Sequence, residues 1–179
     1  MDSLLRDDLI ERLELLDEEA SLMFDSDQRL HLIIVGGGAL VLMEYIARGT
    51  HDIDALDASK QLQELMEFYD INTNVQTYIN NFPYNYEERI KPLDIKGKII
   101  DFFTASLEDI VIAKLYSYRP TDREDITSPT VVNAIDWEKL RFLATSEGEA
   151  KASALNETRY KEFLYSFEEY ERRFRPCDN

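Results

Sequence analysis

Three consecutive glycines, Gly36–Gly38, constrain the fold of this chain more than any other feature. They follow the apolar, β-branched run Leu30–Val35, which predicts a buried strand, and they precede Ala39–Arg48, whose pattern predicts a helix. Because glycine alone adopts positive φ freely, the run predicts a tight turn between strand and helix. Small residues at such a junction also let phosphate groups approach the N–H groups of a helix N-terminus, so phosphate binding is the second interpretation. The spacing matches neither the dinucleotide-binding glycine motif nor the P-loop.

The rest of the chain alternates predicted helices and strands. Residues 3–22 form an amphipathic pattern in which leucines recur between carboxylates, including Asp17, that we expect to be solvated. The segment 107–118 predicts a helix that Ser106 caps and Pro120 ends. Further patterns predict a strand at 50–56, a helix at 60–69, a loop with some strand at 72–86, strands at 88–95 and 98–104 around a Lys96-Gly97 turn, and helices over most of 122–174.

Two carboxylates, Asp52 and Asp54, lie two positions apart in the predicted strand 50–56. Strand side chains alternate with period two, so both carboxylates leave the same face and repel each other unless water or a cation lies between them. Hard oxygen ligands of this kind suit Mg²⁺, which takes one or two protein carboxylates together with substrate phosphates. A solvated strand end is the alternative, although Ile53 and Leu56 favour placing this strand in a core.

A third carboxylate, Asp101, lies in the otherwise apolar strand 98–104. An unpaired buried carboxylate is costly, so Asp101 requires either a partner or a metal ion. Asp94, across the predicted turn, is the rival candidate. We favour Asp101, because Asp94 lies near Lys91, Lys96 and a turn, where solvation explains it.

A charged cluster follows in the predicted helix 107–118 and just beyond it. Lys114 lies within an apolar helical run, where a solvated charge has little reason to be. It reaches a phosphate group in one interpretation and pairs with an acid such as Asp125 in the other. Composition alone favours an ion-pair network that includes Arg119 and Asp122.

Net charge and cysteine content limit the classes of protein that this chain can belong to. The 179 residues include 36 Asp and Glu against 20 Lys and Arg, a net charge of −16 that disfavours a protein coating nucleic acid. The single cysteine, Cys177, excludes an intramolecular disulfide and fits a reducing compartment. The sequence shows neither a signal peptide nor an apolar run long enough to span a bilayer, so we expect a cytoplasmic protein without a membrane partner.

Three ordered motifs resemble the minimal nucleotidyltransferases. They are Gly36-Gly37 at a strand end, the segment from Arg48 through Asp52-Ile-Asp54, and the segment from Ser106 through Lys114 to Asp125. The resemblance is to the AbiEii-type toxin nucleotidyltransferases of type IV toxin–antitoxin systems and their small stand-alone relatives. It implies an α+β, DNA polymerase β-like core with a short mixed sheet flanked by helices, plus N- and C-terminal helices. We expect this core over residues 1–128 and a C-terminal helical extension packed on it over residues 129–179.

The resemblance also implies roles for individual residues. Those implied to bind the nucleotide are Gly36, Gly37, Arg48, Lys114, Asp122 and Asp125. Those implied to be catalytic are Asp52, Asp54, Asp101 and Lys114, and the three aspartates among them are implied to hold Mg²⁺ or Mn²⁺.

The function expected from the resemblance is transfer of an NMP from an NTP to an acceptor hydroxyl, as the toxin of a toxin–antitoxin pair. The acceptor is a protein, an RNA or a small molecule, and the net charge disfavours an extended nucleic acid. The protein partners that we expect are an antitoxin protein or a second copy of the chain. The alternative is a catalytically silent member that binds nucleotide or a partner for regulation.

The last predicted helix carries an aromatic series. Tyr160, Phe163, Phe167, Tyr170 and Phe174 recur at three- and four-residue spacing. This spacing predicts a packing stripe rather than a base-stacking platform, with a homodimer or antitoxin contact as the alternative.

Overall fold

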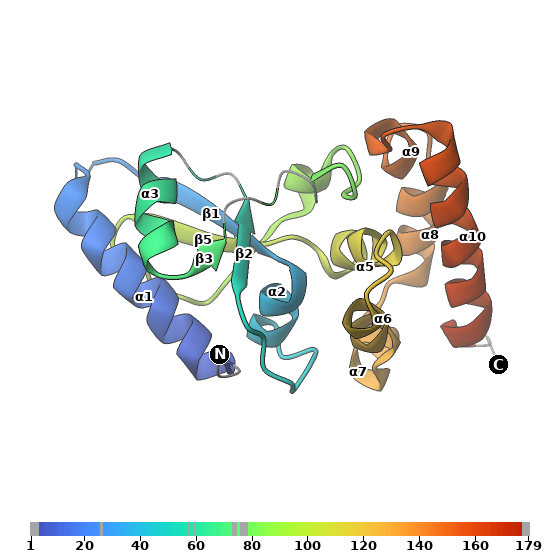
Figure 1. Cartoon of the computed structure of the whole chain (residues 1–179), viewed down its shortest axis with the longest axis horizontal. Coiled ribbons are helices and arrows are strands. Elements are labelled where there is room, and N and C mark those ends of the chain that lie inside the picture. The colour runs from blue at the N-terminus through green and yellow to red at the C-terminus, as the bar shows by residue number, and fades with distance from the viewer. Residues whose placement is uncertain are drawn as a thin grey trace. The chain divides into compact units, whose positions relative to one another are not determined.

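The computed structural model describes residues 4–25, 27–56, 58, 60–72, 75 and 79–176 (Figure 1). The chain divides into two compact units. The first comprises Met1–Val75 and Ile90–Ala105, and the second comprises Gln76–Arg89 and Ser106–Asn179. Cys177 and part of the predicted loop 72–86 lie outside the described residues.

The first unit contains a mixed sheet whose strand order is β3-β2-β1-β5-β4. β1 pairs parallel with β5 and antiparallel with β2, β2 pairs parallel with β3, and β4 pairs antiparallel with β5. The mixed α/β character predicted from the sequence is therefore confirmed. The strands are β1 (Leu30–Val35), β2 (Ile53–Leu56), β3 (Ile71–Asn72), β4 (Lys91–Pro92) and β5 (Ile100–Thr104).

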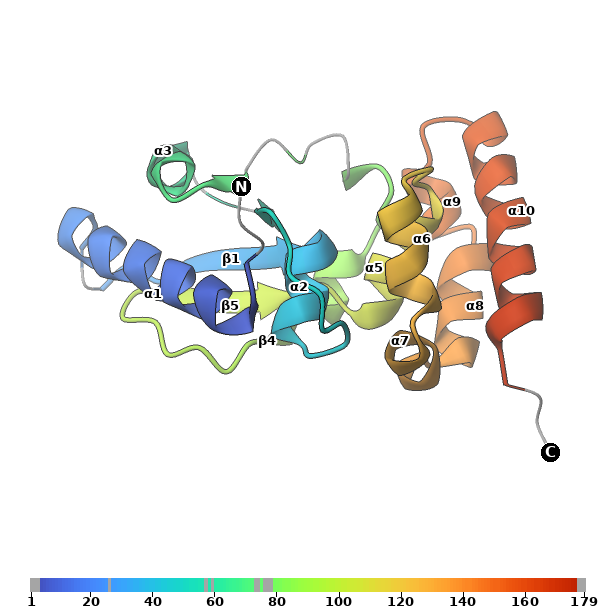
Figure 2. The same cartoon turned by 60° about the horizontal axis from the view of Figure 1, so that its bottom comes forward.

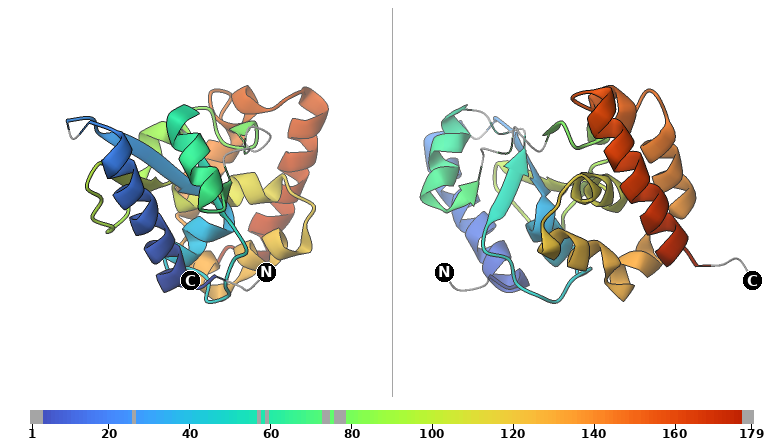
Figure 3. Two further views of the ribbon diagram at one scale, coloured as in Figure 1. Left: turned by 60° about the vertical axis from the view of Figure 1, so that its left-hand side comes forward. Right: turned by 45° about the vertical axis from the view of Figure 1, so that its right-hand side comes forward.

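Two longer helices of the first unit, α1 (Arg6–Met23) and α3 (Lys60–Phe68), lie side by side (Figures 1 and 3). The predicted leucine stripe of α1 is buried, as the amphipathic pattern requires. Asp17 departs from the expectation of solvation, because it is buried and accepts hydrogen bonds from the backbone N–H groups of Lys98, Ile99 and Ile100 at 2.5, 3.0 and 2.8 Å. This carboxylate fixes the segment that leads into β5.

Helix α2 (Gly36–Leu42) begins at the first of the three glycines, earlier than the predicted start at residue 39. Gly36 has φ of +67°, the left-handed conformation that favours glycine, and it makes the tight turn out of β1. The helix is shorter than predicted, and it ends close to Glu44, whose φ is +61°. A left-handed residue cannot continue a right-handed helix.

The second unit is helical in the residues described (Figure 2). Helix α5 packs against α6, α8 and α10, and α10 also packs against α8 and α9. None of the helices described in either unit has the length and apolar character needed to cross a bilayer. The elements are the 3₁₀ helix η1 (Tyr86–Arg89) and the helices α5 (Leu107–Leu115), α6 (Pro120–Thr127), α7 (Pro129–Ala134), α8 (Trp137–Thr145), α9 (Ala150–Ser153) and α10 (Glu157–Phe174).

Buried ion pairs hold α5 within the second unit. The guanidinium of Arg89 donates to both carboxylate oxygens of Asp109, which is fully buried, at 2.9 and 3.0 Å. Glu108, also buried, accepts from Lys139 at 2.7 Å. Polar groups at these positions are satisfied by charged partners, so the helix carries them without an unpaired buried charge.

The boundaries of α5 and α6 test two local predictions. Ser106 accepts a hydrogen bond from the backbone N–H of Asp109, which confirms the predicted cap. The prediction that Pro120 ends this helix is wrong, because α5 ends at Leu115 and Pro120 opens α6. Proline suits the first position of a helix, where the missing N–H has no partner to lose.

The division of the chain differs from the predicted boundary at residue 128. The second unit begins instead at Ser106 and includes Gln76–Arg89. The reason is that α5, which precedes residue 128, packs against α8 and α10, which follow it. The aromatic stripe of α10 contributes to this packing, with Tyr160, Phe163, Phe167 and Tyr170 buried.

Candidate active site

Gly36 and Asp54 lie close together in the first unit. Asp54 lies on β2, opposite Val35 of β1, and Gly36 follows Val35. A Cβ added to Gly36 would lie 2.9 Å from Oδ2 of Asp54, so only a residue without a side chain leaves that oxygen in place. The glycine that makes the turn therefore also makes room for a predicted metal-binding carboxylate.

Asn72 on β3 positions the other oxygen of the same carboxylate. β3 pairs parallel with β2 and places Asn72 opposite Asp54, and the Asn72 side-chain amide donates to Oδ1 of Asp54 at 2.9 Å. Asn72 is not among the predicted site residues, because it lies in a segment whose sequence has no clear period. A polar residue after Ile71 indicates a partner for Asp54 only once the pairing of β2 with β3 is known.

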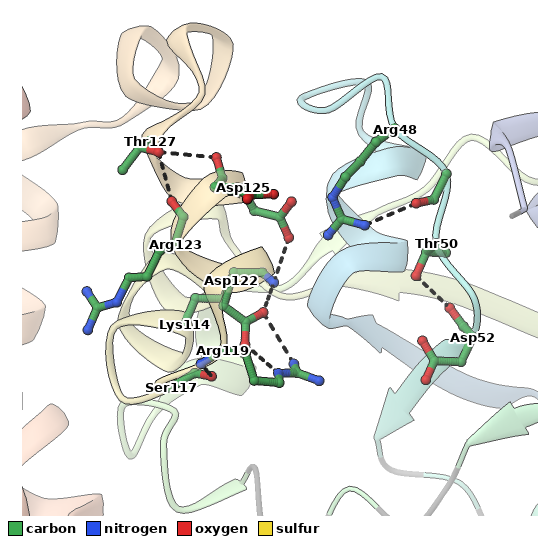
Figure 4. Close-up of polar contacts among 12 residues, drawn as sticks. Arg48, Thr50, Asp52, Lys114, Ser117, Arg119, Asp122, Arg123, Asp125 and Thr127 are labelled. Atoms are coloured by element: carbon green, nitrogen blue, oxygen red, sulfur yellow. Dashed lines mark hydrogen bonds and ion pairs between the residues drawn. The ribbon is translucent and has the colours of Figure 1, made fainter.

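Gly37 lies against a second group of polar residues in the segment before β2. A Cβ on Gly37 would lie 3.4 Å from Oγ1 of Thr50 and 3.7 Å from a terminal nitrogen of Arg48. Arg48 donates to the carbonyl of Gly49 at 3.0 Å, and Thr50 donates to the carbonyl of Asp52 at 3.2 Å (Figure 4). The structure thus brings together the predicted Gly36, Gly37, Arg48 and Asp54, with Thr50 as an addition.

Asp52 is exposed and immediately precedes β2, whereas Asp54 within the strand is partly buried. The period-two alternation of an extended chain directs both side chains to the same side. Within the described residues, no group of three or more His, Cys, Asp or Glu side chains is arranged to hold a metal ion. The carboxylates available at this edge of the sheet are therefore two rather than the three expected.

Asp101 does not lie at this edge. It is opposite His31 on β1, whereas Asp54 is opposite Val35, four residues further along the same strand. At about 3.3 Å per residue these positions are roughly 13 Å apart along the strand. Asp101 instead pairs with Arg29, which donates to it through Nε at 3.2 Å and also through a terminal nitrogen. The hydrogen bond from Arg29 lowers the pKa of Asp101. Because of its position and its pairing with Arg29, Asp101 is not part of the candidate site.

The rival carboxylate, Asp94, does not replace Asp101. It is exposed and follows β4, which lies beyond β5 at the opposite side of the sheet from β2. Neither candidate for a third carboxylate is therefore brought to the edge where Gly36 lies beside Asp54.

A buried ion-pair network in the second unit contains Lys114, Asp122 and Asp125. The Lys114 ammonium on α5 donates to Asp122 at 2.5 Å and to Asp125 at 2.9 Å, and both acids lie on α6 (Figure 4). Each of the three residues is at most 5% exposed. This arrangement confirms the ion-pair interpretation of the charged cluster.

Arg119 completes this network at its exposed side. It donates to Asp122 through Nε at 2.7 Å and through a terminal nitrogen at 3.2 Å. Burial alone raises the pKa of Asp122, but the hydrogen bonds and charges of Arg119 and Lys114 outweigh it and hold the pKa at about 2. Asp122 is therefore ionised at neutral pH and binds two cations.

Comparison with known proteins identifies the family. The family model described as "Nucleotidyltransferase of unknown function (DUF6036)" matches residues 11–175, which include every candidate residue of both units. Searches among curated proteins and among solved structures found no match. Because the match spans most of the 179 residues, this chain belongs to that nucleotidyltransferase family.

Proposed function

We propose that this protein is a metal-dependent nucleotidyltransferase that moves an NMP from an NTP to an acceptor hydroxyl. The observation that carries the proposal is the close approach of Gly36 to Asp54, which joins the glycine turn to a carboxylate, together with membership of a nucleotidyltransferase family. The positive φ of Gly36 accounts for a glycine in the turn, but it does not account for a carboxylate placed directly beside that turn. In this proposal the core resembles that of DNA polymerase β.

The residues at this edge suit a magnesium ion that arrives with its nucleotide. Asp52 and Asp54 supply hard carboxylate oxygens, and Asn72 orients Asp54 without neutralising its charge. Mg²⁺ is commonly bound by one or two carboxylates plus substrate phosphates, so a third protein carboxylate is not required. When bound, the ion would neutralise phosphate charge and make pyrophosphate a better leaving group.

The chain's own groups then have separate roles. The backbone at Gly36 and Gly37 lets the phosphates approach closely, and Arg48 adds a guanidinium that suits phosphate oxygens. The acceptor oxygen forms a bond to the α-phosphorus as the bond from that phosphorus to the bridging oxygen breaks, which releases pyrophosphate. The exposed Asp52 carboxylate is the group that we propose accepts the hydroxyl proton.

Lys114, Asp122 and Asp125 neutralise one another within the second unit, and their role in this proposal is to hold α5 against α6. Lys114 is 5% exposed and its ammonium is bound by both carboxylates, so phosphate binding is assigned to the groups of the first unit.

Incubation with each α-labelled NTP, Mg²⁺ or Mn²⁺, and cell extract tests the proposal. Label on a protein, an RNA or a small molecule identifies the class of acceptor, and growth arrest on expression of the chain tests the toxin role. Asp54→Asn removes a charge while keeping the shape, so it is expected to abolish labelling. Nucleotide binding without label on any acceptor supports the silent alternative instead.

A further inference from the structure

A half-open cavity of about 410 Å³ lies between α6 and α10 in the second unit. Its lining includes two arginines, two hydroxyl side chains and two aromatic rings: Arg123, Arg173, Thr127, Ser166, Tyr170 and Phe174. The network of Lys114 and its two aspartates does not contribute to this lining. Cavities of this size hold ligands no larger than a small organic molecule.

The two arginines are unusual in a chain with so many carboxylates. Across the described residues, neither Arg123 nor Arg173 has a carboxylate within ion-pair distance. By contrast, Arg172 next to Arg173 binds Glu169 at 2.9 Å. Glu169 also lines the cavity, but its charge is engaged by Arg172 rather than by the two lining arginines. The lining therefore presents positive charge on a protein with a net charge of −16.

Both guanidinium groups are oriented by neighbours that leave donors available. One terminal nitrogen of Arg123 donates to the carbonyl of Leu115 at 3.1 Å and reaches Oγ of Ser166 at 3.5 Å. The guanidinium carbon of Arg173 lies 5.6 Å from the centre of the Phe174 ring. A guanidinium has five N–H donors, so each arginine can bind an anion without giving up these contacts.

The aromatic side of the cavity is rigid. The hydroxyl of Tyr170 donates to the carbonyl of Ile126 at 2.5 Å, and the rings of Tyr170 and Phe174 lie 5.3 Å apart. A planar ring of a ligand can pack against such a surface while the arginines bind its anionic group.

We propose that this cavity binds a small molecule in which a phosphate group is attached to a planar ring. Arg123 and Arg173 bind the phosphate, Ser166 adds a hydroxyl group, and Tyr170 with Phe174 receives the ring. This site goes beyond the proposed function, because it uses none of the residues assigned to nucleotidyl transfer.

The test uses phenyl phosphate as the probe, with inorganic phosphate and phenol as its separate halves. Titration of the ¹⁵N-labelled full chain is followed by NMR in EDTA and without NTP, so that the outcome does not depend on transfer activity. Saturable shifts are expected at residues 123–127 and 166–174. Phenyl phosphate is expected to bind more tightly than phosphate, and phosphate more tightly than phenol.

Matched variants test the assignment of the phosphate. Arg173→Ala is expected to weaken phenyl phosphate binding about tenfold, the loss of one charge-assisted contact. Lys161→Ala removes a positive charge from the same helix outside the cavity lining and is expected to change binding less than about twofold. Arg123→Lys keeps the charge but loses the fork geometry, and is expected to weaken binding without loss of the fold. Equal losses for Lys161→Ala and Arg173→Ala, binding of phenol as tight as that of phenyl phosphate, or no saturable shift in this region overturns the proposal.

Discussion

Replacing the three consecutive glycines one at a time by alanine separates the turn from the helix that follows it. Gly36 has φ of +67°, and its substituted Cβ would lie 2.9 Å from Oδ2 of Asp54. A Cβ at position 37 would lie 3.4 Å from Oγ1 of Thr50. A Cβ at position 38 would lie 3.6 Å from the carbonyl oxygen of Asp52, which is an ordinary contact distance. The three positions therefore differ in strain although the sequence makes them look alike.

The expected cost at Gly36 follows from two contributions. Left-handed backbone costs alanine about 1–2 kcal/mol, and displacing the Asp54 carboxylate disturbs its hydrogen bond with Asn72, worth about 1 kcal/mol. The free energy of unfolding should therefore fall by about 2–3 kcal/mol in Gly36→Ala. At Gly38 the helix propensity of alanine adds up to about 1 kcal/mol of stability, because no clash opposes it.

Urea denaturation followed by far-UV circular dichroism measures these free energies. Gly38→Ala serves as the matched control, since it makes the same chemical change two residues away. Gly37→Ala is expected to be close to neutral in stability but to impair phosphate binding, because its Cβ faces Thr50 and Arg48. Equal stability of Gly36→Ala and the parent chain, or a larger loss for Gly38→Ala than for Gly36→Ala, refutes the reasoning.

Three further substitutions test the interactions that hold each unit together. Asp122→Asn leaves Lys114 with one buried carboxylate and should cost about 3 kcal/mol. The pKa of Asp122 is about 2, below its ordinary value, so its contribution to stability is complete above about pH 4 and is lost as pH falls towards 2. An acid titration of the melting temperature should therefore show a smaller loss in Asp122→Asn than in the parent chain. Asp17→Ala leaves three N–H groups without their acceptor, two of them buried, so urea denaturation should show a loss of roughly 2–4 kcal/mol, and an unchanged midpoint contradicts this. Arg89→Ala leaves the buried Asp109 without a cationic partner, with the Ser106 hydroxyl still donating to it, and should cost about 3 kcal/mol by thermal melting. A loss below about 1 kcal/mol means that water replaces the guanidinium.

The parts of the fold that depend on local sequence were predictable. The apolar run before the glycines became β1, the leucine pattern became α1, and the aromatic stripe of α10 is buried as its spacing indicates. Ser106 caps α5 because the capping interaction involves only neighbouring residues. The pairing of Lys114 with acids was also predictable, since a lysine in an apolar helix requires a partner.

The parts that depend on pairing between distant segments were not predictable. The pairing of β1 with β2 and β5 puts Asp101 and Asp54 on the same face of the sheet but at opposite ends of the strands. The sequence does not show this register. Asp17 was expected in solvent because its three N–H partners come from a segment about 80 residues away. Asn72 became part of the candidate site only through the pairing of β3 with β2.

Release of pyrophosphate from an NTP in the presence of Mg²⁺ and acceptor, compared between Asp54→Asn and Asp101→Asn, tests the central claim most directly. Both variants make the same chemical change on the same face of one sheet. The account predicts that Asp54→Asn abolishes release, whereas Asp101→Asn retains it within about threefold, because Asp101 pairs with Arg29 away from the glycine turn. Full activity in Asp54→Asn, or equal loss in both variants, contradicts the account.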